Sequence, residues 1–181
     1  MRVPSILYRL YEQMLWGQIK NGRKPEHIGL IVDGNRRFAR TRGLATNLGH
    51  TKGSEKLEDF LDWCRELNIK IVTLYGFSTE NYSRSSEEVD YLMDLILRKL
   101  KEFQVDPVIK EERVRVRVIG RRDTLSQEMI EEIDKIESMT REHDRFMINI
   151  AISYGGRAEI VDAVKKLALE VQRGKLCGSD I

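Results

Sequence analysis

The stretch His27–Arg40, HIGLIVDGNRRFAR, decides how the chain is interpreted. Its apolar residues 28–32 are typical of a buried β-strand, because a strand covered on both faces is almost continuously apolar. The strand should end at Asp33, and the residues behind it predict a cationic loop. Gly34 lets the backbone approach a ligand closely, and Asn35 tolerates turn geometry.

The chemistry of this stretch suggests a site for Mg²⁺ and a diphosphate. Arg36 and Arg37 carry guanidinium groups, whose planar forks pair with phosphate oxygens. Mg²⁺ takes one or two carboxylates and completes its shell with water and phosphate oxygens, so Asp33 is a candidate ligand. Asp33 is equally consistent with a helix cap or a turn, since Asp-Gly is common turn chemistry.

The composition predicts one globular domain over residues 1–181. Hydrophobic residues make up 41% of the chain and charged residues 33%, unlike a disordered chain. With 31 basic and 29 acidic residues, the net charge of +2 does not predict nucleic-acid binding. Cys64 and Cys177 lack C-x-x-C spacing and fit inert thiols in a reducing compartment. Because no apolar run reaches about 18 residues and no cleavable signal is visible, we expect a cytoplasmic protein.

Residues 1–24 depart from this charge balance. Apolar residues recur there at helical spacing and predict an amphipathic helix over residues 5–20. Five basic residues oppose the single acid Glu12, and Trp16 adds an aromatic ring. Such a helix suits peripheral contact with an anionic membrane, and it is equally consistent with a helix packed on the domain.

The rest of the chain alternates between predicted strands and helices, which is typical of an α/β protein with a mainly parallel sheet and helices on both faces. The segment 114–120 alternates strictly and should lie near a sheet edge, whereas 146–153 is almost continuously apolar and should be central. Thr124 and Gln127 predict a capping box. The remaining expected elements are a loop at 43–46, a strand at 69–77, helices at 50–67, 86–104 and 124–142, and a last helix that stops at Gly174.

Polar clusters follow three of the four expected strands. Because the carboxyl ends of parallel strands share one edge of the sheet, the clusters at 33–37, 78–81 and 154–157 should converge there. Together with His50, Arg84 and Arg157, they would suit an amphiphile with a diphosphate head. The broad apolar face of residues 89–103 would hold its hydrocarbon tail, and Glu80 and Asn81 would help to orient or relay a proton.

Each of these features has a plainer explanation. His50 would satisfy backbone groups at a helix start, and Arg84 would be surface charge. Arg157 would pair with Glu159 or another carboxylate. The broad apolar face would simply be core, as apolar stripes usually are.

Four blocks of sequence resemble the cis-prenyltransferases, the undecaprenyl diphosphate synthase family. They are residues 27–40, GHTKG at 49–53, FSTENYSR at 77–84 and ISYGGRAEI at 152–160. The resemblance implies a butterfly-like α/β fold and a homodimer that repeatedly adds isopentenyl diphosphate to an allylic primer, farnesyl or geranylgeranyl diphosphate. The new double bonds would have Z geometry. The product would be a long polyprenyl diphosphate, a lipid-carrier precursor, with its tail in a tunnel lined by helices around 57–67 and 86–103.

The resemblance also implies roles for individual residues. Asp33 would bind Mg²⁺ and be essential, and Asn81 would assist proton removal. The residues implied to cradle the allylic diphosphate are Gly34, Asn35, Arg36, Arg37, His50 and Arg84, and those implied to flank the substrate are Phe38, Ser78, Thr79, Glu80 and Tyr82.

The chain also departs from the family pattern. Tyr82 stands where many members carry Trp, Ser153 where many carry Asn, and Thr46 where some carry a basic residue. Members continue into a block R-T-[SG]-G-E-x-R-[LI]-S, which holds isopentenyl diphosphate, and then a metal-site glutamate; neither occurs in these residues. The resemblance therefore implies an enzyme truncated at its carboxyl end. The alternative is a non-catalytic allylic-diphosphate-binding subunit or an inactive piece, and the intact Asp33, Arg37 and Asn81 favour the enzyme.

Overall fold

The computed structural model describes residues 5–180, whose four strands form one parallel sheet. The order of the strands is β1-β2-β4-β3, and every pairing is parallel. The predicted parallel α/β class is confirmed, with β3 at an edge and β4 in the interior as expected. The strands are β1 His27–Ile31, β2 Ile71–Ser78, β3 Val114–Ile119 and β4 Phe146–Tyr154.

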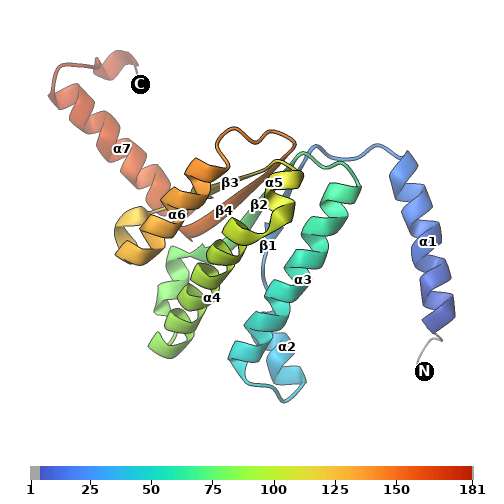
Figure 1. The fold of residues 1–181 in the computed structure, drawn as a ribbon. Coiled ribbons are helices and arrows are strands. Elements are labelled where there is room, and N and C mark those ends of the chain that lie inside the picture. The colour runs from blue at the N-terminus through green and yellow to red at the C-terminus, as the bar shows by residue number, and fades with distance from the viewer. Residues whose placement is uncertain (1–4, 181) are drawn as a thin grey trace.

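A layer of helices covers one face of this sheet. Figure 1 shows α3, α4 and α6 across that face, while α1 and α7 project away from the body on opposite sides. The α-helices of the described residues are α1 Ser5–Asn21, α2 Asn35–Thr41, α3 Thr46–Glu66, α4 Ser86–Val105, α5 Pro107–Glu111, α6 Gln127–Met139 and α7 Gly156–Gln172. Short 3₁₀ turns lie at η1 Thr79–Ser83, η2 Arg122–Thr124 and η3 Gly178–Asp180.

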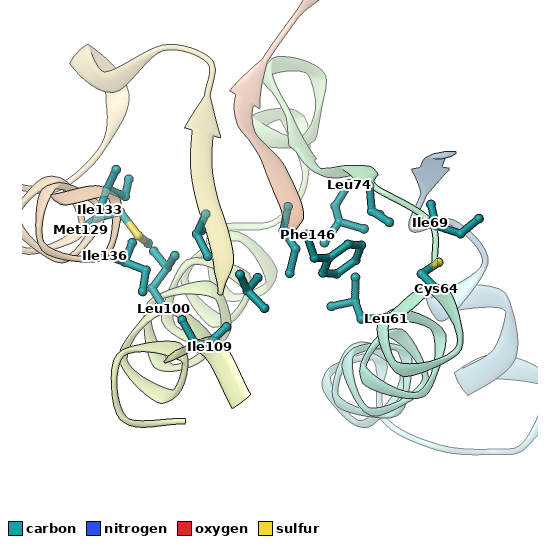
Figure 2. Packing of buried hydrophobic residues seen from close by; sticks show 14 residues of the cluster. Leu61, Cys64, Ile69, Leu74, Leu100, Ile109, Met129, Ile133, Ile136 and Phe146 are labelled. Atoms are coloured by element: carbon teal, nitrogen blue, oxygen red, sulfur yellow. The ribbon is translucent and has the colours of Figure 1, made fainter. Parts of the chain in front are cut away.

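The hydrophobic core lies between the sheet and α3, α4, α5 and α6. Alternate strand residues point toward this layer because successive side chains of a strand face opposite ways. The sequence predicted helices on both faces, but none of these four helices covers the face that carries Thr73, Tyr75 and Asn149. Figure 2 shows the packed cluster, which includes Leu61 and Cys64 of α3, Leu100 of α4, Ile109 of α5, and Met129, Ile133 and Ile136 of α6.

Two predictions about the opening stretch are wrong. The strand is not buried: β1 is an edge strand with β2 as its neighbour, and Ile31 is 73% exposed. The predicted cationic loop is instead the short helix α2. Gly34 adopts the left-handed conformation (φ 94°, ψ −8°) and turns the chain directly into that helix, so Arg36 and Arg37 lie on helical backbone.

Three boundaries of two helices also differ from prediction. Helix α6 is capped by Ser126, whose Oγ accepts a hydrogen bond from the Met129 backbone N–H, whereas Thr124 belongs to η2. The helix ends at Met139, short of residue 142. Helix α3 begins at Thr46, so the loop expected at 43–46 is shorter.

Helix α1 confirms the helix predicted over residues 5–20. Residues 1–4 of the predicted basic segment lie outside the described residues. Four apolar side chains of this helix are exposed: Leu10, Tyr11, Met14 and Ile19. The alternative that the helix packs on the domain therefore does not describe these side chains. Among the described residues, no helix has both the length and the apolar character needed to cross a membrane.

Candidate active site

A cavity of about 800 Å³ begins at the carboxyl ends of β1 and β2 and continues between α3 and α4. Polar side chains that follow the two strands line its head end. The remaining wall is mainly apolar and includes Leu57 and Leu61 of α3, Leu92, Ile96 and Phe103 of α4, and Ile150 of β4. The broad apolar face of α4 is therefore both core and cavity wall: Leu95 and Leu100 are buried and also line the cavity, together with Leu92 and Ile96.

Two glycines one helical turn apart hold α2 against α3. A Cβ at Gly49 would lie 2.4 Å from the backbone oxygen of Asn35, and a Cβ at Gly53 would lie 2.4 Å from its side-chain Oδ1. At Gly49 only a hydrogen atom fits beside the backbone of α2, and at Gly53 a Cβ would fit only if the Asn35 side chain moved, so α2 approaches α3 closely. His50, between these glycines, lines the cavity, which explains the spacing of the GHTKG block.

The head end carries an excess of positive charge. Asp33 is the carboxylate of this head end, and its Oδ1 accepts a hydrogen bond from the Gly34 backbone N–H at 2.6 Å. It does not cap α2, so the cap alternative does not describe it. The arginines that line the head end are Arg36, Arg37, Arg40 and Arg84.

The surroundings of Asp33 suit a metal site in which the substrate and water supply the other ligands. In the described part of the chain, no three His, Cys, Asp or Glu side chains gather into a metal site. A single carboxylate beside arginines matches a Mg²⁺ that takes its other ligands from a diphosphate and water. The donor set is therefore compatible with a substrate-bridged cation.

A buried carboxylate behind the cavity joins the cationic side chains. Glu88 Oε1 lies 3.1 Å from His50 Nε2 and accepts a hydrogen bond from Arg84 Nη1 at 2.8 Å, and Arg36 Nε lies 3.7 Å from Oε2. His50 and Glu88 are 5% and 8% exposed. Burial raises the pKa of Glu88, but the His50 hydrogen bond and the charges of Arg84 and Arg36 outweigh it, so this pKa lies below the ordinary value.

Sequence reasoning missed Glu88. Ser85 followed three residues later by Glu88 matches a helix capping box, in which the glutamate only serves the helix start. Ser85 does accept a hydrogen bond from the Glu88 backbone N–H, but the Glu88 side chain turns to His50 and Arg84. His50 therefore does more than satisfy backbone groups at a helix start, and Arg84 is not merely surface charge. The usable signal was the spacing of Arg84 and Glu88, which are four residues apart.

The second polar cluster is only partly in the cavity. Ser78 and Asn81 line it, and the Asn81 side-chain oxygen accepts a hydrogen bond from the Ser78 backbone N–H at 2.9 Å. Tyr82 instead packs behind the site. Its hydroxyl lies 2.6 Å from Ser153 Oγ, and its ring meets Phe77 edge to face at 4.9 Å. Ser153 has φ 53°, a left-handed conformation that Asn tolerates better than Ser.

Several predicted site residues lie outside the cavity wall. Phe38 is exposed, with the Arg42 guanidinium 5.3 Å from its ring centre. Arg157 is exposed, and Glu159 accepts a hydrogen bond from Tyr154 rather than pairing with Arg157. The cluster 154–157 therefore does not converge on the cavity with the other two. Of the predicted residues, the cavity wall excludes Phe38, Thr79, Glu80, Tyr82 and Arg157.

Comparison with known proteins gives consistent matches. The family model Prenyltransf, which describes undecaprenyl diphosphate synthases, matches residues 31–180. A tritrans,polycis-undecaprenyl-diphosphate synthase (geranylgeranyl-diphosphate specific) from Pyrococcus horikoshii is 47% identical over 96% of this chain and 67% of its own length. An isoprenyl transferase from Thermus thermophilus is 47% identical over 97% of this chain and 66% of its own. Lavandulyl diphosphate synthase from Lavandula x intermedia, solved with dimethylallyl diphosphate, superposes with a TM-score of 0.80 at 30% identity, covering 87% of this chain and 66% of that one.

The fold and the site define a parallel α/β protein with a cationic head end and an apolar cleft. The chain belongs to the undecaprenyl diphosphate synthase family of prenyltransferases. It spans about two thirds of the length of the relatives that it matches.

Proposed function

We propose that this chain binds an allylic diphosphate and acts in Z-selective chain elongation with isopentenyl diphosphate. One observation carries the proposal: the cavity joins an arginine-rich head end to an apolar cleft between α3 and α4. A diphosphate with a prenyl tail matches both halves. The product would be a long-chain polyprenyl diphosphate, the precursor of a lipid carrier.

The residues at the head end divide the work of binding. Arg36, Arg37 and Arg84 bind the diphosphate oxygens through charge-assisted hydrogen bonds. Asp33 holds Mg²⁺ together with those oxygens, and the bound cation would stabilise the negative charge of the leaving diphosphate. Asn81 lines the cavity, and its part in this proposal is to assist proton removal. Because its side-chain oxygen already accepts from the Ser78 N–H, it would act through its NH₂ group, which donates a hydrogen bond and so orients a proton acceptor instead of taking the proton itself.

The names of the relatives refine the choice of primer. The Pyrococcus horikoshii relative is named as specific for geranylgeranyl diphosphate. That name favours geranylgeranyl over farnesyl diphosphate as the primer here. Thr46 lines the cavity at a position where some family members carry a basic residue, so this chain holds the head with one cation fewer.

The assembly and location are also part of the proposal. The family resemblance supports a cytoplasmic homodimer. The exposed apolar side chains of α1, together with basic residues at its carboxyl end, support peripheral contact with an anionic membrane. Lys20 lies in the last turn of α1, and Arg23 and Lys24 follow the helix.

The test combines binding with elongation. Binding of geranylgeranyl diphosphate is measured by calorimetry for the unmodified chain, Arg37→Ala and the control Arg157→Ala, whose side chain lies outside the cavity wall. We expect Arg37→Ala to weaken binding about tenfold, or about 1.4 kcal/mol, and Arg157→Ala to leave it unchanged.

Elongation is then assayed with Mg²⁺ and labelled isopentenyl diphosphate. A ladder of long products that Asp33→Ala abolishes would establish the enzyme. Primer binding that depends on Arg37 without any ladder would favour the non-catalytic binding subunit. A folded sample that shows neither would overturn the proposal.

A further inference from the structure

Among the described residues, three side-chain hydrogen bonds join α3 to α4. They form polar bridges on either side of the apolar part of the cavity wall. Two of them lie near the head end of the cavity, and the third lies further along the helices. The apolar side chains between them line the cavity rather than closing it. The bridges are His50 to Glu88, Thr51 to Tyr91, and Glu58 to Lys99.

The third bridge crosses the wall part way along the cleft. Glu58 lies eight residues after His50, about 12 Å along the axis of α3 at ~1.5 Å per residue. On α4, Ile96 precedes Lys99 and Phe103 follows it, and both line the cavity. A tail that starts at the head end therefore meets Glu58 and Lys99 before it reaches the far end.

The pair forms part of the outer wall. Both side chains line the cavity, yet those of Glu58 and Lys99 are 51% and 30% exposed. The Lys99 ammonium donates to Glu58 at 2.6 Å and to Glu102 at 2.5 Å. Burial lowers the pKa of Lys99, but the hydrogen bonds to Glu102 and Glu58 outweigh it and raise this pKa, so the lysine is charged at neutral pH.

We propose that the ion pair between Glu58 and Lys99 is a specificity-determining latch, which sets how long a hydrocarbon tail the cleft between α3 and α4 holds. This inference rests on the proposed function. A short tail ends before the pair and leaves it intact. A longer tail must lie against two charged groups or push the helices apart, and either is unfavourable because a charge loses hydration or its partner. Since part-exposed ion pairs are weak, the latch shifts the preferred length without blocking long tails.

The test measures affinity as a function of tail length. Calorimetry gives the dissociation constants of geranyl, farnesyl, geranylgeranyl and a longer all-trans polyprenyl diphosphate. In Lys99→Met we expect the affinity for the longest relative to geranyl diphosphate to rise about fivefold, with geranyl binding unchanged within about twofold. The control is Lys101→Met on the same helix, where the lysine pairs with Glu128 and does not line the cavity.

A second variant protects the test against a local packing effect. The exchange Glu58→Lys with Lys99→Glu, made together with Glu102→Gln so that the new carboxylate does not face a second one, restores a bridge of reversed polarity and should return the ratio toward that of the unmodified chain. An unchanged ratio in Lys99→Met, or the same change in Lys101→Met, would overturn the latch while leaving the proposed function intact. Failure of the unmodified chain to bind any of these diphosphates would overturn both.

Discussion

The Arg84 guanidinium donates a hydrogen bond to the Glu88 carboxylate at 2.8 Å, and this contact fixes the direction of an arginine that lines the cavity. The same carboxylate oxygen lies 3.1 Å from His50. Glu88 itself is absent from the cavity wall, so it acts on a ligand only through its neighbours. It is therefore a positioning residue, and it leaves Arg37 and Arg40 free to neutralise a diphosphate.

Replacing Glu88 separates positioning from charge. Glu88→Gln removes a negative charge near an anion site, which alone would strengthen diphosphate binding. It also turns charged hydrogen bonds worth about 1.5–3 kcal/mol each into weaker bonds to a neutral amide, and we expect this loss of positioning to dominate and weaken binding about tenfold. Calorimetric titration with geranylgeranyl diphosphate checks this, with the exposed Glu87→Gln as the matched control. Tighter binding by Glu88→Gln would show that its charge merely opposes the ligand.

The lowered pKa of Glu88 predicts a pH dependence of stability. A carboxylate with a folded-state pKa below its unfolded value stabilises the fold fully above the unfolded pKa, about 4.3 for Glu. That contribution is lost as the pH falls through the folded-state pKa. The difference in unfolding free energy between the unmodified chain and Glu88→Gln should be constant near neutral pH and shrink below about pH 4. Urea unfolding of both proteins across this range measures it, and a difference independent of pH would count against a charged Glu88.

The two cysteines should differ in reactivity. Cys64 is 2% exposed and burial raises its pKa, whereas Cys177 is exposed and the hydrogen bond from Ser179 lowers its pKa. Since the thiolate is the nucleophile, iodoacetamide at neutral pH should alkylate Cys177 in the native protein and both thiols in urea. Peptide mass analysis locates the adduct, and Cys177→Ser is the control. This revises the sequence-based expectation that both thiols are inert.

Much of the fold could be predicted because hydrophobic periodicity reports it directly. The strict alternation of residues 114–120 and the apolar run of 146–153 correctly separated the edge strand β3 from the interior strand β4. The edge position of β1 was missed because an apolar run does not reveal whether a strand has one neighbour or two. The capping residue of α6 was missed because Thr124 and Ser126 lie two residues apart and both suit a cap.

Site residues could be predicted only where they follow the end of a strand directly in the sequence. Asp33, Arg37 and Asn81 were found because they follow β1 and β2 directly, and all three line the cavity. Glu88 and the Glu58–Lys99 bridge escaped notice because each joins different helices. The local sequence does not show how close two side chains on different helices lie.

The two glycines of α3 provide the last prediction, because they determine where α2 places its arginines. In Gly49→Ala the new Cβ would meet the Asn35 backbone oxygen, which cannot rotate away, and the Ala39 Cβ at 2.9 Å. Overpacking costs about 1–3 kcal/mol, and the better helix propensity of Ala offsets about 1 kcal/mol of it. We therefore expect a net loss of stability of up to about 2 kcal/mol and weaker diphosphate binding, since α2 must move and it carries Arg36 and Arg37.

Gly53→Ala and Gly17→Ala complete this comparison. At Gly53 the new Cβ would meet the Asn35 side chain, which can rotate, so stability should change less than in Gly49→Ala while diphosphate binding still weakens. At Gly17, on α1, a Cβ has open space, and the substitution should leave binding unchanged. Urea unfolding and calorimetry on the three variants measure both quantities. If Gly49→Ala bound geranylgeranyl diphosphate as tightly as Gly17→Ala, the close contact of α2 with α3 would not control the position of the arginines.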